Sequence, residues 1–245
     1  MPLVLSLFPG IGLLDQAFEE EGFCVVRGPD PLWGGDIHRF HPEPSRFDGV
    51  IGGPPCQAFS RLRFIVEANG YETAPNLIPE YERCIAEAQP AWFVMENVPA
   101  APVPAVPGYI IQHELVSDVW VGGITSRLRR FSFGTRDGRK LQPEIVALHP
   151  EPEHSALASG GGRPVPVALG GSGKLKRSHK SALKNYGYKT TDAFREHCRK
   201  QGLAPDFDLP PFTVSAKVKA VGNGVPLPMG RAIARAVKAA LQAAA

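Results

Sequence analysis

The sequence contains no long apolar run: none approaches the roughly 20 residues that a membrane-spanning helix needs. Its start, MPLVLSLFPGIG, is apolar but short, lacks a basic leader and leads into an acidic helical pattern, so we expect no signal peptide. Neither observation points to a membrane or to secretion. We therefore expect a cytoplasmic protein.

Cysteine is also scarce. Four cysteines are scattered along the chain with no CxxC pair, which argues against a disulfide framework and against a zinc site. Cys24 and Cys84 lie in apolar strand-like and helical contexts and are expected to be small buried residues, and Cys198 lies among charged residues. Cys56 alone has an unusual setting, in the stretch IGGPPCQAFS. Neither packing nor a disulfide explains that setting, which suggests a reactive thiol.

The net charge is only +3, but the two halves of the chain differ in sign. Residues 1–120 contain 6 Lys and Arg against 16 Asp and Glu, whereas residues 121–245 contain 21 against 8. This asymmetry suggests a surface that binds a polyanion, although a solvated basic face would give the same count. With 43% hydrophobic and 21% charged residues, the composition is that of a globular chain.

Short apolar runs alternate with segments of helical periodicity over the first 135 residues. Several runs are nearly continuous in apolar residues, as strands buried on both faces are. The alternation predicts a parallel, doubly wound α/β sheet. The expected strands are Leu3–Phe8, Phe23–Val26, Asp48–Gly53, Ala91–Glu96 and Tyr109–Val116, and the expected helices are one that stops at Gly22 and one over Leu77–Gln89.

The pattern changes after Thr135. Residues 136–211 contain Pro-rich and Gly-rich pieces, and Gly171–Lys200 holds 9 Lys and Arg against 2 acids. We interpret 136–211 as a smaller irregular module. The chain then returns to the first pattern with a predicted helix near its end, so residues 1–135 and 212–245 are expected to form one domain.

Three motifs carry the chemistry: GGPPCQAFS at 52–60, MENVP at Met95–Pro99 and SRLRRFSFG at Ser126–Gly134. With LFPGIG before them and EHCRKQGLAPDF and AVGNGVPLP after them, they give the chain a clear resemblance to the DNA (cytosine-5)-methyltransferase family, in the compact form of phages and bacteria. PPCQ followed by ENV is a specific combination, and the motifs span the chain. The resemblance implies a Rossmann-like class I S-adenosylmethionine-dependent methyltransferase sheet, with 136–211 as target-recognition region.

The resemblance also implies the reaction, which is methyl transfer from S-adenosylmethionine to C5 of a flipped-out cytosine in double-stranded DNA. Because C5 is a poor nucleophile, the ring must first be attacked at C6, which suits the Cys56 thiolate. Glu96 would neutralise ring N3, and Arg127 and Arg129 would orient the base at its O2. Asn97 is expected to brace the Glu96 loop.

A glycine turn after a strand lets backbone approach a nucleotide-like ligand, although a plain tight turn would look the same. Asp30, after the second expected strand, is the candidate ribose ligand. The implied cofactor residues are Phe8, Gly10, Ile11, Gly12, Asp30, Asp36, Pro54, Asn223 and Val225. The expected DNA contacts are Ser60, Arg61, Arg63, Lys174, Lys176 and Arg177. No metal is implied.

The chain departs from the family pattern at Leu13, where a glycine is usual, and at Thr125, where a glutamine is usual. The glutamate usually found after the second strand is missing. None of these departures affects Cys56 or Glu96, so we expect an active monomeric enzyme, which could have a restriction endonuclease as companion. The alternatives are an RNA (tRNA) cytosine-C5 methyltransferase and a non-catalytic nucleic-acid-binding relative.

Overall fold

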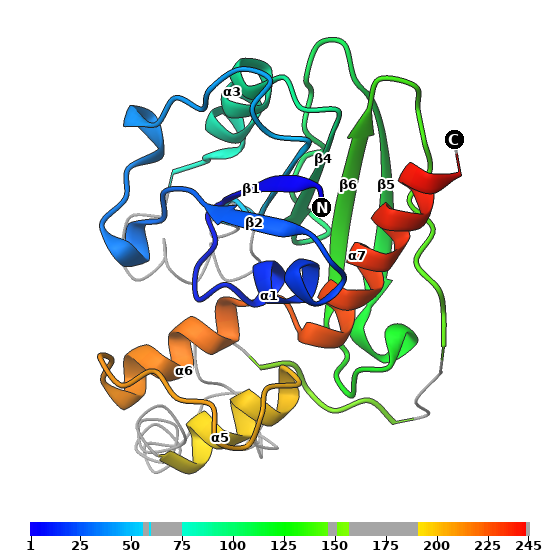
Figure 1. Cartoon of the computed structure of the whole chain (residues 1–245). Helices are drawn as coiled ribbons and strands as arrows, with labels where there is room; N and C mark the ends of the chain where they lie inside the picture. Colours follow the sequence, from blue (N-terminus) through cyan, green and yellow to red (C-terminus); the bar gives the residue numbers. More distant parts are fainter. Residues whose placement is uncertain (56–58, 60–74, 147–150, 157–190, 244–245) are drawn as a thin grey trace, which may run out of the picture.

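The computed structural model describes residues 1–55, 59, 75–146, 151–156 and 191–243. Within these ranges the chain forms a six-stranded sheet with helices on both faces (Figure 1). The strand order is β2-β1-β3-β4-β6-β5. None of the helices in these ranges combines the length and the apolar character that crossing a membrane requires.

The first four strands are parallel, as the sequence predicts. Strands β1 and β3 are the middle two of these four, and their side chains are buried on both faces. The observed bounds differ from the predicted ones by at most one residue at either end. The strands are β1 (Leu3–Leu7), β2 (Cys24–Arg27), β3 (Gly49–Gly52) and β4 (Trp92–Asn97).

The other two strands, β5 (Ile110–Ser117) and β6 (Leu128–Thr135), are antiparallel, which corrects the prediction of a parallel sheet. They are joined by the short 3-10 helix η4 (Asp118–Val121) and a glycine pair at 122–123. This connection is too short for the crossover that a parallel pair needs, so the chain folds back on itself. Strand β6 then inserts between β4 and β5, which brings the basic stretch of β6 beside β4.

Two helix layers cover the sheet. Helices α1 (Leu13–Glu20) and α7 (Leu227–Gln242) lie side by side on one face, while α3 (Ile78–Ala88) lies on the other (Figure 1). Alternate residues of each strand supply the two cores: Trp92 and Val94 face α1 and α7, whereas Phe93 and Met95 face α3.

Two helices that sequence analysis did not predict pack beside α1. They are α5 (Thr191–Lys200) and α6 (Val214–Asn223), with Phe194 and Cys198 of α5 buried against Leu13 and Val218. Part of the range assigned to the recognition module therefore packs on the first domain. The boundary at residue 211 stays a prediction.

Candidate active site

The carboxyl ends of β1 to β4 meet at one edge of the sheet, where open α/β sheets bind their ligands. The segments that leave these ends are 8–12, 28–36, 53–55 and the end of β4 at Glu96 and Asn97. These segments contain most of the residues that the sequence predicts for the cofactor and for catalysis. The topology thus brings the predicted residues of this edge together.

The turn after β1 has a backbone that favours glycine. Gly10 and Gly12 have φ angles of 57° and 80°, and Phe8, a bulky residue, also has a positive φ of 57°. Such a conformation in a non-glycine residue is uncommon and is often found at ligand sites. Apart from Gly10 and its two chain neighbours, no atom of the described residues lies within 4 Å of the place where a Cβ of Gly10 would stand, so these residues leave space beside the turn.

Asp30 and Trp33 hold this turn in place. The Asp30 carboxylate accepts hydrogen bonds from the amides of Gly10 (2.8 Å) and Leu32 (2.7 Å), and the Trp33 indole donates to the Gly10 carbonyl (2.6 Å). Trp33 is 56% exposed and packs edge to face against Phe212, with ring centroids 5.5 Å apart. Sequence analysis singled out Asp30 as a ligand but missed Trp33 and its structural link to the turn.

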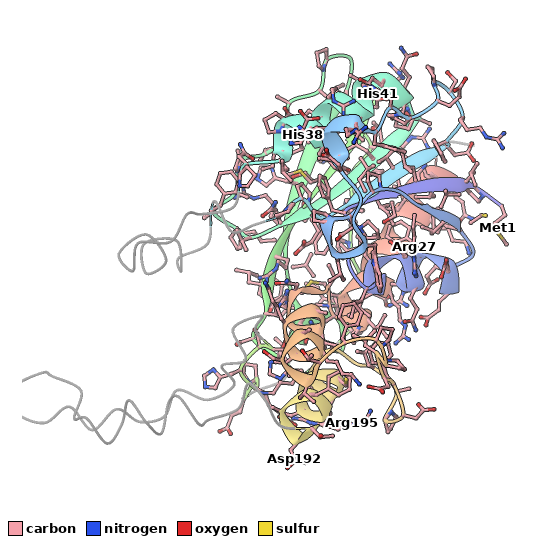
Figure 2. The ribbon with its side chains drawn as sticks, turned by 90° about the vertical axis from the view of Figure 1, so that its left-hand side faces the viewer. Met1, Arg27, His38, His41, Asp192 and Arg195 are labelled. Atoms are coloured by element: carbon pink, nitrogen blue, oxygen red, sulfur yellow. The ribbon has the colours of Figure 1, made fainter. Side chains whose placement is uncertain are left out.

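Arg27 covers the other side of the turn, where Figure 2 labels it beside α1. The positive φ of Gly12 favours glycine, and a Cβ there would also push the Arg27 guanidinium aside. The guanidinium is held by Asp15 (2.9 Å), whose carboxylate is fully buried and also accepts from the Ser6 hydroxyl. Burial raises the pKa of Asp15, and this effect outweighs the hydrogen bond from Ser6 and the Arg27 charge.

Asp36 is exposed and begins the 3-10 helix η2 (Ile37–Arg39), where its carboxylate accepts from the His38 amide at 3.0 Å. Arg83 of α3 fixes this segment by donating to the carbonyls of Ile37 (2.8 Å) and Phe40 (3.0 Å). Figure 2 shows His38 at this place, next to α3. The other carboxylate oxygen of Asp36 has no hydrogen-bond partner within the described ranges, so it is open to a ligand.

Glu96 and Arg129 form the central ion pair of the edge. Arg129 donates through Nε to Glu96 Oε1 at 2.8 Å, and both side chains are largely buried, with 16% and 12% of the side chain exposed for Arg129 and Glu96. The pair forms because β6 lies beside β4, which puts both side chains on the same face. Glu96 Oε2 faces Gly53, where a Cβ would stand 3.1 Å from it. The predicted catalytic acid and one predicted arginine thus meet.

Asn97 links β4 to the loop that precedes Cys56. Its amide donates to the Pro54 carbonyl at 3.1 Å, and its side-chain oxygen accepts from the Val98 amide at 2.9 Å. Both groups of the buried amide are therefore used in holding backbone. The predicted bracing role of Asn97 agrees with these contacts.

Arg127 is not brought to the Glu96 pair. It is only 4% exposed, and its guanidinium donates to the carbonyls of Ala156 (2.9 Å) and Gly222 (3.1 Å). Arg127 directly precedes β6 and Arg129 lies two residues further along the chain, but only Arg129 contacts Glu96. The catalytic role that the sequence assigns to Arg127 stays a prediction.

The turn between α6 and α7 carries the last two predicted cofactor residues. Asn223 is exposed at the end of α6, while Val225 is buried. Gly224 lies so close to Leu13 that a Cβ would be 2.6 Å from the Leu13 side chain. The larger residue at position 13 is thus accommodated by a glycine on the facing turn. Ile11 joins the same cluster, partly buried.

The remaining predicted residues lie outside the described part of the chain. They are the nucleophile Cys56 and the DNA contacts Ser60, Arg61, Arg63, Lys174, Lys176 and Arg177. The described neighbours of Cys56 are Pro54 and Pro55. Their position next to Glu96 and Asn97 fixes where the cysteine loop begins.

Comparison with known proteins bears on the same region. Residues 33–102, which include PPCQ, Glu96 and Asn97, match the sequence profile of the C-5 cytosine-specific DNA methylases. Over these residues the chain is similar to the C-5 cytosine-specific DNA methylases. The recognition made from the sequence motifs is thereby confirmed.

Two curated relatives support the methylase match. The type II methyltransferase M.NgoPII of Neisseria gonorrhoeae is 35% identical over 116 residues, covering 39% of this chain and 33% of the relative. The type II methyltransferase M.AquIA of Picosynechococcus sp. is 33% identical over 120 residues, covering 39% of this chain and 48% of the relative. The methylase region of this chain therefore spans between a third and a half of the length of these relatives.

Solved structures extend the likeness to the whole fold. An E. coli prophage protein described as a DNA modification methyltransferase superposes with a TM-score of 0.62 at 18% identity, over 99% of this chain and 100% of that one. At this identity the likeness concerns the fold alone. The predicted Rossmann-like fold is confirmed.

The three cysteines within the described ranges of this chain differ in exposure. Cys24 is exposed, which corrects the expectation that it is buried: it begins an edge strand with mostly exposed side chains. Cys84 and Cys198 are buried, and burial raises the pKa of both thiols to about 11.

We predict that a maleimide at pH 8 labels Cys24 of the native protein within minutes, whereas Cys84 and Cys198 react only after unfolding. The reactive species is the thiolate, which is scarce at pH 8 for a pKa of about 11 and is also sterically shielded. Peptide mass spectrometry over a time course measures the three rates. Equal labelling of Cys84 and Cys24 in the folded protein would contradict the assignment.

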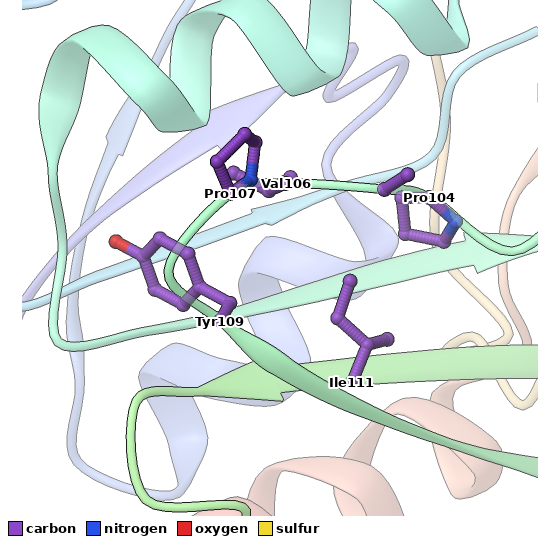
Figure 3. A pocket seen from close by; sticks show the side chains of 6 residues that line it. Pro104, Val106, Pro107, Tyr109 and Ile111 are labelled. Carbon is purple, nitrogen blue, oxygen red and sulfur yellow. The ribbon is translucent and has the colours of Figure 1, made fainter.

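An apolar hollow of about 480 Å³ lies away from the ion pair (Figure 3). Its lining includes Val106, Tyr109 and Ile111, which pack with Phe93 on the α3 side of the sheet. Glu96 is on the opposite face, because it is three residues from Phe93 along β4. The Tyr109 hydroxyl is already bonded to the Pro90 carbonyl, so we assign no chemistry to this hollow.

Proposed function

We propose that the protein transfers the methyl group of S-adenosylmethionine to C5 of cytosine in DNA. The observation that carries the proposal is the Glu96–Arg129 ion pair, with Arg129 Nε 2.8 Å from Glu96 Oε1. Glu96 lies beside Gly53, which precedes Cys56 by three residues in the sequence. In the proposed reaction the Cys56 thiol joins this acid and this cation at the carboxyl edge of the sheet. The reaction at an unreactive ring carbon needs these three groups.

Cys56 starts the reaction as a nucleophile. Its thiolate sulfur forms a bond to ring C6, and the electrons of the C5–C6 double bond move through the ring toward N3. C5 thereby becomes an enamine carbon that can accept a methyl group. After transfer, C5 loses its proton to solvent, the C5–C6 double bond re-forms and the thiolate leaves. The Asn97 bond to Pro54 holds the start of the loop from which Cys56 must attack.

Glu96 and Arg129 act on the polar edge of the base. Glu96 Oε1 is engaged by Arg129, which leaves Oε2 to carry the proton of the acid form, to give it to N3 as charge develops there, and to take it back when C5 accepts the methyl group. The Arg129 guanidinium, held beside this carboxyl group, would donate to O2, the exocyclic carbonyl oxygen next to N3. A base buried in a duplex cannot meet these groups, so the target cytosine must be flipped out.

The residues of the glycine turn fit S-adenosylmethionine. Space is open beside Gly10, Asp36 offers a free carboxylate oxygen, and the exposed Trp33 ring is suited to stack on a purine. When bound, S-adenosylmethionine supplies the methyl group from its sulfonium and leaves as S-adenosylhomocysteine. Asp30 is occupied in holding the turn, so a ribose contact would have to share its carboxylate with Gly10 and Leu32.

The substrate we propose is double-stranded DNA, bound by the basic second half of the chain through its phosphates. The names of the type II relatives suggest modification paired with restriction, and we extend this to a companion endonuclease here. A monomeric enzyme remains our prediction.

Labelled S-adenosylmethionine offered with plasmid DNA or with tRNA tests the choice of substrate. We expect label in plasmid DNA alone, because the likeness of residues 33–102 is to DNA methylases. Label in tRNA alone would replace the proposed substrate by RNA. No label in either, with binding of both retained, would indicate a non-catalytic nucleic-acid-binding protein.

A further inference from the structure

Arg127 connects three segments that are far apart in the sequence. Its Nη1 donates to the carbonyls of Ala156 (2.9 Å) and Gly222 (3.1 Å), and its Nη2 approaches the Asn223 carbonyl at 3.5 Å. The side chain is 4% exposed. A guanidinium with its donors in a fixed fork is well suited to bind several backbone carbonyls at once.

The first of these segments leads into the predicted recognition module. Residues 151–156 lie beside residues 124–126, just before β6. The Ser126 amide donates to the Glu153 carbonyl (2.8 Å), and the Glu153 amide donates to the Ile124 carbonyl (2.9 Å). The Glu153 carboxylate pairs with Arg199 of α5. Ala156, bound by Arg127, is the last described residue before the basic stretch that we expect to meet DNA.

The second segment is the turn that carries the predicted cofactor residues Asn223 and Val225. Gly222 and Asn223 are the last residues of α6, where carbonyl groups lack helical partners and carry partial negative charge. A buried cation at this end satisfies those carbonyls. Gln201 supports the same turn by donating to the carbonyls of Val221 (2.6 Å) and Gly224 (2.9 Å).

The third segment is the start of β6 itself. The Asp118 amide donates to the Arg127 carbonyl (2.9 Å), and the buried Asp118 carboxylate accepts from the amide and hydroxyl of Thr125 (3.0 and 2.7 Å). Thr125 thus uses its hydroxyl to fasten the strand where the family usually has glutamine. Arg129, two residues beyond Arg127 along the chain, is thereby aimed at Glu96.

We propose that Arg127 is a positioning residue, which holds the turn at 222–225 and the segment at 151–156 in place around the Glu96–Arg129 pair, and that it does not contact the base. This inference rests on the proposed methyl-transfer function. A group that touched the flipped base would have to release two carbonyls to do so. In the positioning role Arg127 affects cofactor binding even when no DNA is present.

Three variants separate a positioning role of Arg127 from direct contact with the base. They are Arg127→Met, Arg127→Lys and Arg129→Met. The dissociation constant of S-adenosylhomocysteine is measured without DNA, and kcat and KM are measured with DNA. We expect Arg127→Met to weaken cofactor binding about 10-fold through loss of charged hydrogen bonds, with partial recovery in Arg127→Lys. Arg129→Met should change cofactor binding less than about 2-fold and lower kcat instead.

Hydrogen exchange of the Gly224 amide, which bonds to the Val221 carbonyl, gives a readout that needs neither ligand nor activity. It should quicken in both Arg127 variants and stay unchanged in Arg129→Met. Unchanged exchange and cofactor binding in Arg127→Met, with kcat lost, would overturn the positioning role. If Arg127→Met does not fold, Arg127→Lys decides by the same two measurements. A wild-type protein that binds no S-adenosylhomocysteine would refute the proposed function, while the exchange result would still test the positioning role.

Discussion

Replacing Glu96 with glutamine is expected to lower kcat by about 10²- to 10⁴-fold, the usual contribution of a positioned acid. Glutamine keeps the size of the side chain, and its carbonyl oxygen can still accept from Arg129 Nε. It cannot, however, give a proton to N3 when Cys56 attacks C6. The loss should therefore appear in kcat, while the dissociation constant of S-adenosylhomocysteine stays within about 2-fold.

Glu43→Gln is the matched control for this variant. Glu43 is an exposed carboxylate in the segment that precedes β3, at the end of the sheet opposite the strand ends that carry Glu96. Its replacement should leave kcat unchanged. The midpoint temperature of thermal unfolding of both variants must stay close to that of the wild type for the comparison of kcat to hold. A Glu96→Gln enzyme with wild-type kcat would remove Glu96 from the mechanism.

Replacing Cys56 with serine is expected to abolish methyl transfer, with a fall of at least about 10⁴-fold, as when a nucleophile is removed from other enzymes. A serine hydroxyl is hardly ionised at neutral pH and has no base assigned to activate it. DNA containing 5-fluorocytosine makes the role visible, because fluorine at C5 cannot leave as a proton does. The wild-type protein should then remain covalently bound to DNA after methyl transfer.

Cys24→Ser is the control for the nucleophile, because Cys24 is exposed but lies at the start of β2, away from Glu96. It should keep both activity and the adduct, which denaturing electrophoresis detects as a shifted band. A stable adduct formed by Cys56→Ser, or no adduct in the wild type, would contradict covalent attack by Cys56.

The parallel half of the sheet could be predicted from the sequence because a short continuous stretch of residues indicates each of its strands. Strands buried on both faces leave continuous apolar runs, and glycine or proline ends them, so β1, β3 and β4 lie where the pattern indicates. Glu96 and the glycine turn could be placed at the same edge of the sheet, since the carboxyl ends of parallel strands lie at one edge.

The antiparallel half and the α5–α6 pair could not be predicted in this way. The insertion of β6 between β4 and β5 depends on a pairing that no local pattern records, although the short link at 118–127 is compatible only with a hairpin. Helix α5 is rich in charge and shows few apolar residues. Phe194 and Cys198 are buried only because Leu13, about 180 residues earlier, lies opposite them.

Residue types alone also could not separate Arg127 from Arg129. Both belong to one basic motif, yet one binds backbone carbonyls and the other binds Glu96. The difference depends on the carbonyls of Ala156 and Gly222, which the chain brings to Arg127 from distant positions. Backbone carbonyls leave no trace in a sequence motif.

The chemical identity of the product tests the central claim most directly. Double-stranded DNA is incubated with the protein and S-adenosylmethionine, digested to nucleosides and analysed by mass spectrometry against standards. The account predicts 5-methyldeoxycytidine, formed by the wild type and absent with Cys56→Ser and with Glu96→Gln at matched times. A methyl group found on the exocyclic nitrogen of cytosine or on adenine, or 5-methyldeoxycytidine formed equally by Cys56→Ser, would contradict it.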